Sequence, residues 1–402
     1  MGARPSRRFL VDRDFIVPTG VSFTYALLTS FATMLLPVYL KNGLHFTGAQ
    51  IGLVFGAYGA TALAVVVPSG LSTDALKPKA IVLATMIVTI VAAVAIGAAR
   101  AFLPVLLCFV LFGLAGNAMK IAVESVLFKT HDARRSGEVF GLYQAFRMLA
   151  YGVGLLGAGY LVERIGYPNT IFLLAAVLAT VAITGLALPD VPVAWARLSV
   201  YARDIRRPDV LVFAAWLFLF TSHWGAETTS YALFVRENLG LAPHLIGWFM
   251  SGEFAVFAAT SYALGRRHDR GVDLGRILLA GLLCSGLGHV GMTFPWVPSS
   301  FAFRLLHGFG DGCISVVMYV GISRLFLRER VGGNSGLINF VTMAGVLTGS
   351  LVYGPVGARF GYAVPFLASG LITIALAAFP QARRRASGLH GRVGRAGPLF
   401  PE

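Results

Sequence analysis

Apolar residues in this chain fall in repeated blocks, which short polar segments separate. Each block has about 20 residues, the length that a helix needs to cross roughly 30 Å of hydrocarbon. The pattern therefore predicts an all-α membrane protein with twelve transmembrane helices. The predicted spans are 16–40, 48–73, 79–99, 102–128, 137–162, 167–188, 211–235, 243–265, 275–294, 299–327, 332–357 and 361–380.

The two halves of the chain match each other at one fixed offset of 195 residues, with no insertion. The matched positions are mostly glycines and charged residues. Each half holds six spans, and an even number returns the chain to its starting side. The halves are therefore predicted to be parallel repeats that form two pseudo-symmetric six-helix bundles. The matches include Gly70 with Gly265, Asp74 with Asp269, Gly113 with Gly308, Gly137 with Gly332, and Gly166 with Gly361.

Proline and arginine gather between the two halves, in the stretch 189–209. We interpret this stretch as a cytoplasmic linker with one interfacial helix around 194–205. The predicted organisation is an N-terminal six-helix bundle at 1–188, the linker at 189–209, a C-terminal six-helix bundle at 210–380, and a basic cytoplasmic tail at 381–402.

Composition supports a membrane protein. Mean hydropathy is +0.75, and only 13% of the residues are charged, against about 25% in soluble domains. The 47 glycines suit close helix packing in lipid. The three cysteines lie within apolar spans at no ligand or disulfide spacing, so we expect no metal site and no cofactor.

The net charge of +15 is distributed by side of the membrane. Of the 33 Lys and Arg residues, 25 fall in segments on the side of the N-terminus, 5 in loops on the other side and 3 inside spans. This positive-inside pattern places both termini in the cytoplasm. We expect lipid contact, no nucleic-acid partner and a monomeric chain. Short loops and arginine-rich ends suit a bacterial inner membrane.

Two loops at the repeat offset carry a shared motif. Gly70 and Asp74 stand in the first, and Gly265, Asp269 and Arg270 in the second. Both loops resemble the Gly-x-x-x-Asp-Arg-x-Gly-Arg-Lys signature of the major facilitator superfamily. The resemblance implies the fold of that family, in which this loop acts as a cytoplasmic gate that latches the two bundles.

Two further glycine patterns resemble elements of the same family. Span 10 reads Arg304 to Gly310, similar to an Arg-x-x-x-Gly-x-Gly element that the family associates with proton coupling in span 4. Here Phe109 replaces the arginine of span 4, so the resemblance implies that the element works from the C-terminal bundle. Gly152 to Gly159 in span 5 partly resembles a glycine-rich motif of exporters, with Leu155 in place of its proline.

Ionisable side chains inside a bilayer are costly, and are functional candidates by default. Burial favours the protonated form of a carboxylate, and a nearby cation favours the ionised form. Moving Arg304 or His307 toward or away from Asp311 would therefore change the protonation of Asp311, and the same holds for Glu227 beside His223. On this argument the proton-coupling candidates are Glu227, Asp311, His223, His307, Arg304 and Glu253.

Spans 1, 4, 7 and 10 line the central cavity in the family that the chain resembles. The substrate-cavity candidates on these and neighbouring spans are Tyr25, Thr29, Asn117, Lys120, Glu124, Tyr143, Gln144, Arg147, Trp224, Tyr231 and Asn339. Structural alternatives stay open. Lys120 and Glu124 are also spaced for an intrahelical ion pair, and Glu253 for a hydrogen bond to a neighbouring helix. We expect His289 in span 9 to be a packing residue.

The sequence therefore indicates a proton-coupled secondary transporter that moves a small polar or charged organic molecule by alternating access. The partial exporter motif slightly favours efflux by antiport. The alternatives are a proton-symport importer and a non-transporting sensor or assembly protein of the same fold. Neither a nucleotide-binding loop nor an enzyme motif is found in the sequence.

Overall fold

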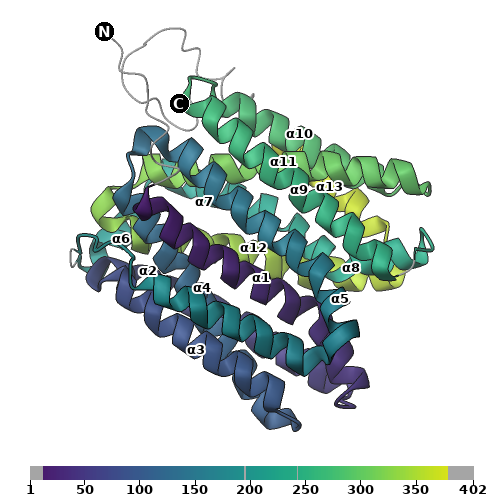
Figure 1. Ribbon diagram of the computed structural model, residues 1–402. Coiled ribbons are helices and arrows are strands. Elements are labelled where there is room, and N and C mark those ends of the chain that lie inside the picture. The colour runs from purple at the N-terminus through teal and green to yellow at the C-terminus, as the bar shows by residue number, and fades with distance from the viewer. Residues whose placement is uncertain (1–11, 194–195, 242, 379–402) are drawn as a thin grey trace. The chain divides into compact units, whose positions relative to one another are not determined.

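The computed structural model describes residues 12–193, 196–241 and 243–378. Within these ranges every regular element is a helix (Figure 1). The elements are α1 (Arg13–Asn42), α2 (Gly48–Ala75), α3 (Pro78–Ala98), α4 (Phe102–Thr130), the 3-10 turn η2 (Ala133–Arg135), α5 (Ser136–Gly185), α6 (Leu198–Ile205), α7 (Pro208–Thr221), α8 (His223–Glu237), α9 (Pro243–Asp269), α10 (Leu274–Met292), α11 (Val297–Leu325), η3 (Arg328–Arg330), α12 (Val331–Phe360) and α13 (Val364–Leu376).

Nine helices in the described part of the chain are long and apolar enough to cross a membrane. The other three predicted spans coincide with α1, α9 and the shorter apolar helix α13. Each predicted span therefore coincides with a helix over most of its described residues, and the all-helical fold class is confirmed. The count of twelve crossings and the cytoplasmic side of the termini stay predictions.

Two of the predicted spans join in one helix, and another is divided. Helix α5 carries the fifth and sixth spans, with a kink at Gly166, where φ is 76°. Gly361, at the repeated position, has a φ of 96° and separates α12 from α13. Glycine adopts this left-handed conformation without the clash that a Cβ would cause. The predicted span 211–235 is divided at Ser222 into α7 and α8.

Contacts along the chain divide it into two compact units. Unit 1 contains the described residues of 1–132, 153–196 and 328–336, and unit 2 those of 133–152, 197–327 and 337–402. In unit 1, α4 packs against α1, α2 and α3. In unit 2, α11 packs against α9 and α10, and α10 packs against α13. The start of α5 therefore packs with elements of the C-terminal half, and the start of α12 with elements of the N-terminal half.

The aspartate of each repeated loop motif binds a helix start. In unit 1, Asp74 accepts hydrogen bonds from the backbone N–H groups of Gly332 and the next residue, at 3.1 and 2.7 Å. In unit 2, Asp269 accepts from Gly137 and the next residue, at 3.1 and 2.6 Å. A carboxylate at this place satisfies free backbone donors and opposes the positive end of the helix dipole. The same contact therefore occurs twice, at positions related by the sequence repeat.

The motif glycines allow these contacts. A Cβ on Gly70 would lie 2.7 Å from the carbonyl oxygen of Gly332, and a Cβ on Gly265 would lie 2.0 Å from that of Gly137. Any side chain at either glycine would push the two backbones apart and lengthen the aspartate hydrogen bonds. Arg270, the other motif residue, is exposed in the turn after α9.

The outer surface of the helices is apolar, and ionisable groups are buried. Leu351 is 69% exposed and Ile183 is 68% exposed, whereas Arg304 is 1% exposed and Asp311 is 2% exposed. A protein folded in water shows the reverse preference. This distribution suits a chain whose solvent is lipid, because apolar side chains can face acyl chains at no cost while charges require internal partners.

The linker contains the short helix that the sequence predicts. Helix α6 spans Leu198–Ile205, inside the expected interval 194–205. It ends before Pro208, which occupies the first turn of α7 and has no backbone N–H to lose there. Arg207 ties this junction to unit 2 by donating to the carbonyl of Leu325 at 2.8 Å. The predicted basic tail, 381–402, lies outside the described residues.

The two motif aspartates differ in their surroundings. Asp74 pairs with Lys129 at 3.0 Å, and both side chains are 1% exposed. Asp269 lies at the end of α9, four residues beyond the predicted span. Burial raises the pKa of Asp269 to about 6, although two backbone hydrogen bonds and Arg135 favour its ionised form. A carboxyl group with a raised pKa binds more protons in the folded state than in the unfolded state, so it lowers stability as pH rises through this range.

Asp269→Asn should therefore change how stability depends on pH. Between about pH 4 and pH 6 the wild-type melting temperature should fall relative to that of the variant, because only the wild type must ionise a buried carboxyl group. Thermal unfolding of the purified protein over a pH series measures this difference. Asp190→Asn, at a carboxyl group that is 64% exposed, is the control and should show no such trend. Parallel pH curves for wild type and Asp269→Asn would contradict the expectation.

Candidate functional site

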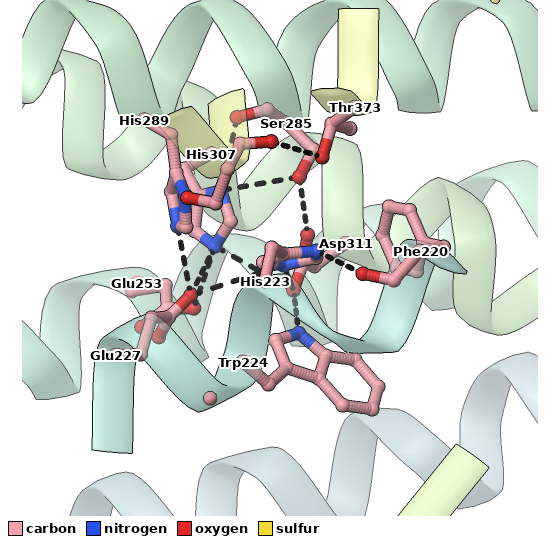
Figure 2. Close-up of polar contacts among 12 residues, drawn as sticks. Phe220, His223, Trp224, Glu227, Glu253, Ser285, His289, His307, Asp311 and Thr373 are labelled. Carbon is pink, nitrogen blue, oxygen red and sulfur yellow. Dashed lines mark hydrogen bonds and ion pairs between the residues drawn. The ribbon is translucent and has the colours of Figure 1, made fainter. Parts of the chain in front are cut away.

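Unit 2 contains a buried cluster of ionisable side chains, which Figure 2 shows. Its members come from α8, α9, α10 and α11, and all lie within unit 2. They are His223, Glu227, Glu253, His289, Arg304, His307 and Asp311. We call this set the unit 2 cluster.

Glu227 lies at the centre of the unit 2 cluster. Its Oε1 lies 2.6 Å from Nε2 of His307 and 3.1 Å from Nε2 of His289. Its Oε2 accepts a hydrogen bond of 2.8 Å from Nη2 of Arg304. The side chain of Glu227 is 15% exposed, the most of any carboxylate in the cluster. One carboxylate therefore links three bases from two other helices.

Asp311 forms the second acidic centre. It accepts hydrogen bonds from the indole Nε1 of Trp224 at 2.5 Å and from the hydroxyl of Ser285 at 2.8 Å. Its Oδ2 lies 3.4 Å from Nε2 of His223 and 3.6 Å from Nε2 of His307. Asp311 is thus held by α8, α10 and its own helix α11, and it shares His307 with Glu227.

Arg304 joins two acids and an aromatic ring. The same Nη2 that binds Glu227 also donates to Glu253. The guanidinium carbon lies 4.0 Å from the centre of the Tyr231 ring, a cation–π contact. Its Nε and Nη1 have no hydrogen-bond partner within the described chain, although Arg304 is only 1% exposed. Burying such donors without a partner is costly, so these nitrogens are a feature that a function must explain.

Close helix approach brings these side chains together. A Cβ on Gly308 would lie 2.7 Å from the carbonyl oxygen of Glu253, and one on Gly310 would lie 2.3 Å from the backbone nitrogen of Ser285. A Cβ on Gly288 would lie 2.6 Å from the backbone nitrogen of His307. The glycines of span 10 therefore set how near α9 and α10 come to α11.

The cluster residues of α8 follow directly after a break between two helices. Ser222 separates α7 from α8, and His223 begins α8. Nδ1 of His223 lies 2.6 Å from the carbonyl oxygen of Phe220. Glu227 follows one turn later, so both side chains lie on one face of α8. The break therefore places two members of the cluster at a helix start.

The structure brings all six predicted proton-coupling residues into one cluster, with one change of pairing. From the spacing along span 10, either Arg304 or His307 was expected to act on Asp311. Arg304 instead pairs with Glu227 and Glu253, because their helices approach the N-terminal part of α11. His307 takes the position beside Asp311. Glu253 therefore does form the interhelical hydrogen bond considered as its structural alternative.

His289 was interpreted as a packing residue, and the structure corrects this interpretation. It is 1% exposed and contacts Glu227 through Nε2 at 3.1 Å. Its ring stacks on His307 with centres 4.2 Å apart. No ionisable residue lies three or four positions from His289 along its span. The available signal was the rule that any ionisable side chain in a membrane span is a functional candidate.

The predicted cavity residues of unit 2 lie at several places. Tyr231 lies under Arg304, and Trp224 binds Asp311. At the start of α5, Arg147 donates to Gln144 at 2.7 Å, and Gln144 contacts Ser315 of α11 at 3.3 Å. Two further candidates, Tyr143 and Asn339, are buried at 0% and 2% exposure.

The predicted cavity residues of unit 1 include an ion pair. Lys120 and Glu124 lie 3.8 Å apart on α4, as the structural alternative expected. Asn117 donates back to the carbonyl of Gly113 at 3.1 Å, and Thr29 donates to the carbonyl of Tyr25 at 2.8 Å. These are local helix bonds, so they do not themselves identify a binding site.

The sequence repeat shows that the two units differ at the cluster. The residues of unit 1 at the positions of Glu253, Arg304 and His307 are Tyr58, Phe109 and Phe112. These aromatic rings contact one another, with centres 6.3 and 6.2 Å apart. Both repeats keep the glycine contact, since a Cβ on Gly113 would lie 2.5 Å from the carbonyl oxygen of Tyr58. The backbone arrangement is thus shared, and the charged chemistry belongs to unit 2.

Comparison with known proteins supports the same fold. The human organic anion transporter MFSD10 (TETRAN) superimposes with a TM-score of 0.74 and 14% identity, over 93% of this chain and 99% of that chain. The E. coli fucose:proton symporter FucP superimposes with a TM-score of 0.72 and 14% identity, over the same shares. A search of curated proteins found no match.

The family comparison covers nearly the whole chain. The model of the Major Facilitator Superfamily matches residues 19–235 and again 215–401, one match for each half. This agrees with the repeated loop motif and with the apolar helices long enough to cross a membrane. The chain therefore belongs to the Major Facilitator Superfamily, a family of multi-pass integral membrane transporters.

Proposed function

We propose that this chain is a proton-coupled secondary transporter, which exports a small polar or charged organic molecule by antiport. The observation that carries the proposal is the convergence of Glu227, Glu253 and Asp311 on one arginine and three histidines in unit 2. Buried charges in a membrane protein are costly, and a purely structural bundle has no need of them.

The coupling step follows from the contacts of Glu227. When ionised, this α8 carboxylate holds Arg304 and His307 of α11. A proton on Glu227 cancels that attraction, while Arg304 keeps Glu253 as its partner. Protonation therefore weakens the link between α8 and α11 without leaving the arginine unpaired. A change in one pairing of this kind can bias a protein between two conformations.

The polar groups of the cluster suit a substrate with acceptor oxygens. Nε and Nη1 of Arg304 and the hydroxyl of Tyr231 are buried, and they find no hydrogen-bond partner among the described residues. A carboxylate or hydroxyl oxygen of a substrate would satisfy them. Sugars and organic anions, the substrate classes in the titles of the two similar structures, are therefore the first probes to test.

Reconstituted vesicles with an acidic lumen test transport and its direction together. An antiporter should accumulate a labelled substrate in the lumen as protons leave, and a symporter should deplete a preloaded lumen. A lumenal pH dye should report proton flux only when substrate is present. If neither protons nor substrate moved, as expected of a sensor or assembly protein, the result would contradict the proposal.

Glu227→Gln should uncouple transport. Glutamine keeps the shape of the side chain and cannot lose a proton, so pH-gradient-driven accumulation should fall at least tenfold, while exchange of labelled for unlabelled substrate continues. Tracer flux in vesicles, with and without the gradient, measures both activities. Glu163→Gln, at an exposed carboxylate, is the control. Normal gradient-driven accumulation by Glu227→Gln would show that Glu227 is not the coupling acid.

Asp311→Asn should also abolish gradient-driven accumulation while exchange continues. Asparagine retains one oxygen to accept from Trp224 or Ser285, but it cannot balance a protonated His307. The pH dependence of exchange, measured between pH 5 and pH 8 where histidine titrates, should flatten relative to wild type. An unchanged profile in a variant that elutes as folded protein would contradict a coupling role for Asp311.

A further inference from the structure

Three histidines from three helices direct the same ring atom to one place. Nε2 of His307, His289 and His223 lies 2.6, 3.1 and 3.9 Å from Oε1 of Glu227. The four ligand atoms all lie within 4.8 Å of one another. The rings come from α8, α10 and α11, and each histidine is at most 1% exposed. Figure 2 shows this convergence of imidazoles and carboxylate.

The other ring nitrogen of each histidine also has a polar contact. Nδ1 of His223 lies 2.6 Å from the carbonyl oxygen of Phe220. Nδ1 of His307 lies 3.1 Å from the carbonyl oxygen of Ser285, whose hydroxyl donates to Asp311. A carbonyl oxygen can only accept, so both Nδ1 atoms carry the proton. In a neutral ring the proton on Nδ1 leaves a lone pair on Nε2.

His289 completes the same pattern. Its Nδ1 lies 2.8 Å from the hydroxyl of Ser369, which donates to the carbonyl of Phe366 at 3.4 Å and so accepts from the ring. All three histidines therefore have Nδ1 bound to an oxygen and Nε2 within 3.9 Å of Oε1 of Glu227, and Nε2 of His223 also lies 3.4 Å from Asp311. Histidines that bind metals are oriented by their second nitrogen in this way.

Lone pairs that face a carboxylate require a cation between them. With a neutral ring and an ionised carboxylate, Nε2 of His307 and Oε1 of Glu227 would be two acceptors only 2.6 Å apart, and they would repel unless a proton or a metal ion lay between them. Nε2 of His223, at 1% residue exposure, forms no hydrogen bond within the described chain. This buried nitrogen lies between two carboxylates, 3.4 Å from Oδ2 of Asp311 and 3.9 Å from Oε1 of Glu227.

The charges of the cluster indicate the charge of a cation that it could hold. Glu227, Glu253 and Asp311 carry three negative charges, and Arg304 carries one positive charge. With neutral histidines the described cluster has a net charge of −2, which a low-dielectric site does not tolerate. One divalent cation, or two protons shared among the histidines and carboxylates, would balance it.

The arrangement of the rings suits one metal ion better than two protonated histidines. Two protonated rings would be neighbours, since ring centres lie 4.2 to 5.2 Å apart among the three histidines. A metal ion instead binds all three nitrogens at once. Ligand atoms around a tetrahedral zinc ion lie about 3.3 Å apart at the usual bond lengths. The observed distances from Oε1 bracket this value, so small shifts of side chains would close the site.

We propose that His223, His289 and His307, through Nε2, together with the carboxylate of Glu227, bind one divalent transition-metal ion of the zinc type. Three imidazole ligands favour such an ion over calcium or magnesium, which prefer oxygen. Arg304 orients the carboxylate through Oε2. Ser369 and the carbonyls of Phe220 and Ser285 orient the rings. The sequence suggested no metal site, because its ligands come from helices that are distant along the chain.

This inference concerns the same cluster as the proposed function but does not depend on transport. Binding is measured on the purified full chain in detergent, with any affinity tag removed and without a pH gradient. Co²⁺ is the probe, because tetrahedral cobalt has strong visible absorption bands and octahedral cobalt has weak ones. Wild-type protein should bind one Co²⁺ per chain with tetrahedral bands, and Zn²⁺ should displace it. Zn²⁺ should also raise the melting temperature.

Variants separate ligands from neighbours. His289→Gln should lower Co²⁺ affinity about 100-fold or more, and Ser369→Ala, which removes only a ring contact, about tenfold. Ser369 is a small buried residue, and Ser369→Ala is a small change. Its Co²⁺ affinity therefore tests the site even if His289→Gln fails to fold. His131→Gln, at a histidine outside the cluster, is the control and should bind as wild type does.

Three outcomes would overturn the metal site. They are no saturable Co²⁺ binding by wild type, octahedral bands only, or equal affinity in wild type, His289→Gln and Ser369→Ala. The two proposals also fail separately. Proton-driven transport without Co²⁺ binding would remove the metal site alone. Tetrahedral Co²⁺ binding by a protein that moves no protons with substrate would keep the metal site and remove proton coupling.

Discussion

The balance of charge around Glu227 is the constraint on which the arrangement of unit 2 depends. This carboxylate contacts Arg304, His289 and His307, and its side chain is only 15% exposed. Removing one partner from a buried ion pair typically costs about 3–5 kcal/mol, because the remaining charge is left uncompensated. The contacts of α8, α10 and α11 are therefore coupled to one another through a single side chain. Any event that changes the charge of the cluster must change these contacts.

Glycine makes this constraint possible. Gly288, Gly308 and Gly310 let backbones approach so closely that a Cβ would lie under 3 Å from its neighbours. Such an approach brings short side chains, such as those of Asp311 and Ser285, within hydrogen-bond distance. The same residue type positions Asp74 and Asp269 against helix starts. Small residues thus serve both the packing of the helices and the placement of charge.

The repeat separates architecture from chemistry. The glycine contacts and the aspartate bonds to helix starts occur twice, related by the offset of 195 residues. The acids and bases of the unit 2 cluster have no counterparts in unit 1, where Phe109 and Phe112 stand at the positions of Arg304 and His307. At a close helix crossing only glycine fits, so that residue is the same in both repeats. The side chains beside the crossing are less restricted and differ between the repeats. We infer that the two units share a backbone scaffold, and that the cluster of buried acids and bases is specific to unit 2.

The sequence by itself determined the helices, the repeat and the family. Each follows from local patterns: apolar blocks long enough to span a bilayer, glycines at a fixed offset, and loop motifs such as Gly265 to Arg270. It also identified six of the seven members of the cluster, because an ionisable residue in an apolar span stands out without any knowledge of its partners.

The tertiary structure alone decided which of these residues meet. Helical spacing relates Arg304 to Asp311 along one helix, but Arg304 pairs with Glu227 and Glu253 from α8 and α9. His289 showed no pattern within its own span, and its contact with Glu227 exists only because α10 packs against α11. Pairing of charges across helices depends on crossing positions and rotations. These are set by contacts over the whole unit, and no local stretch of sequence contains them.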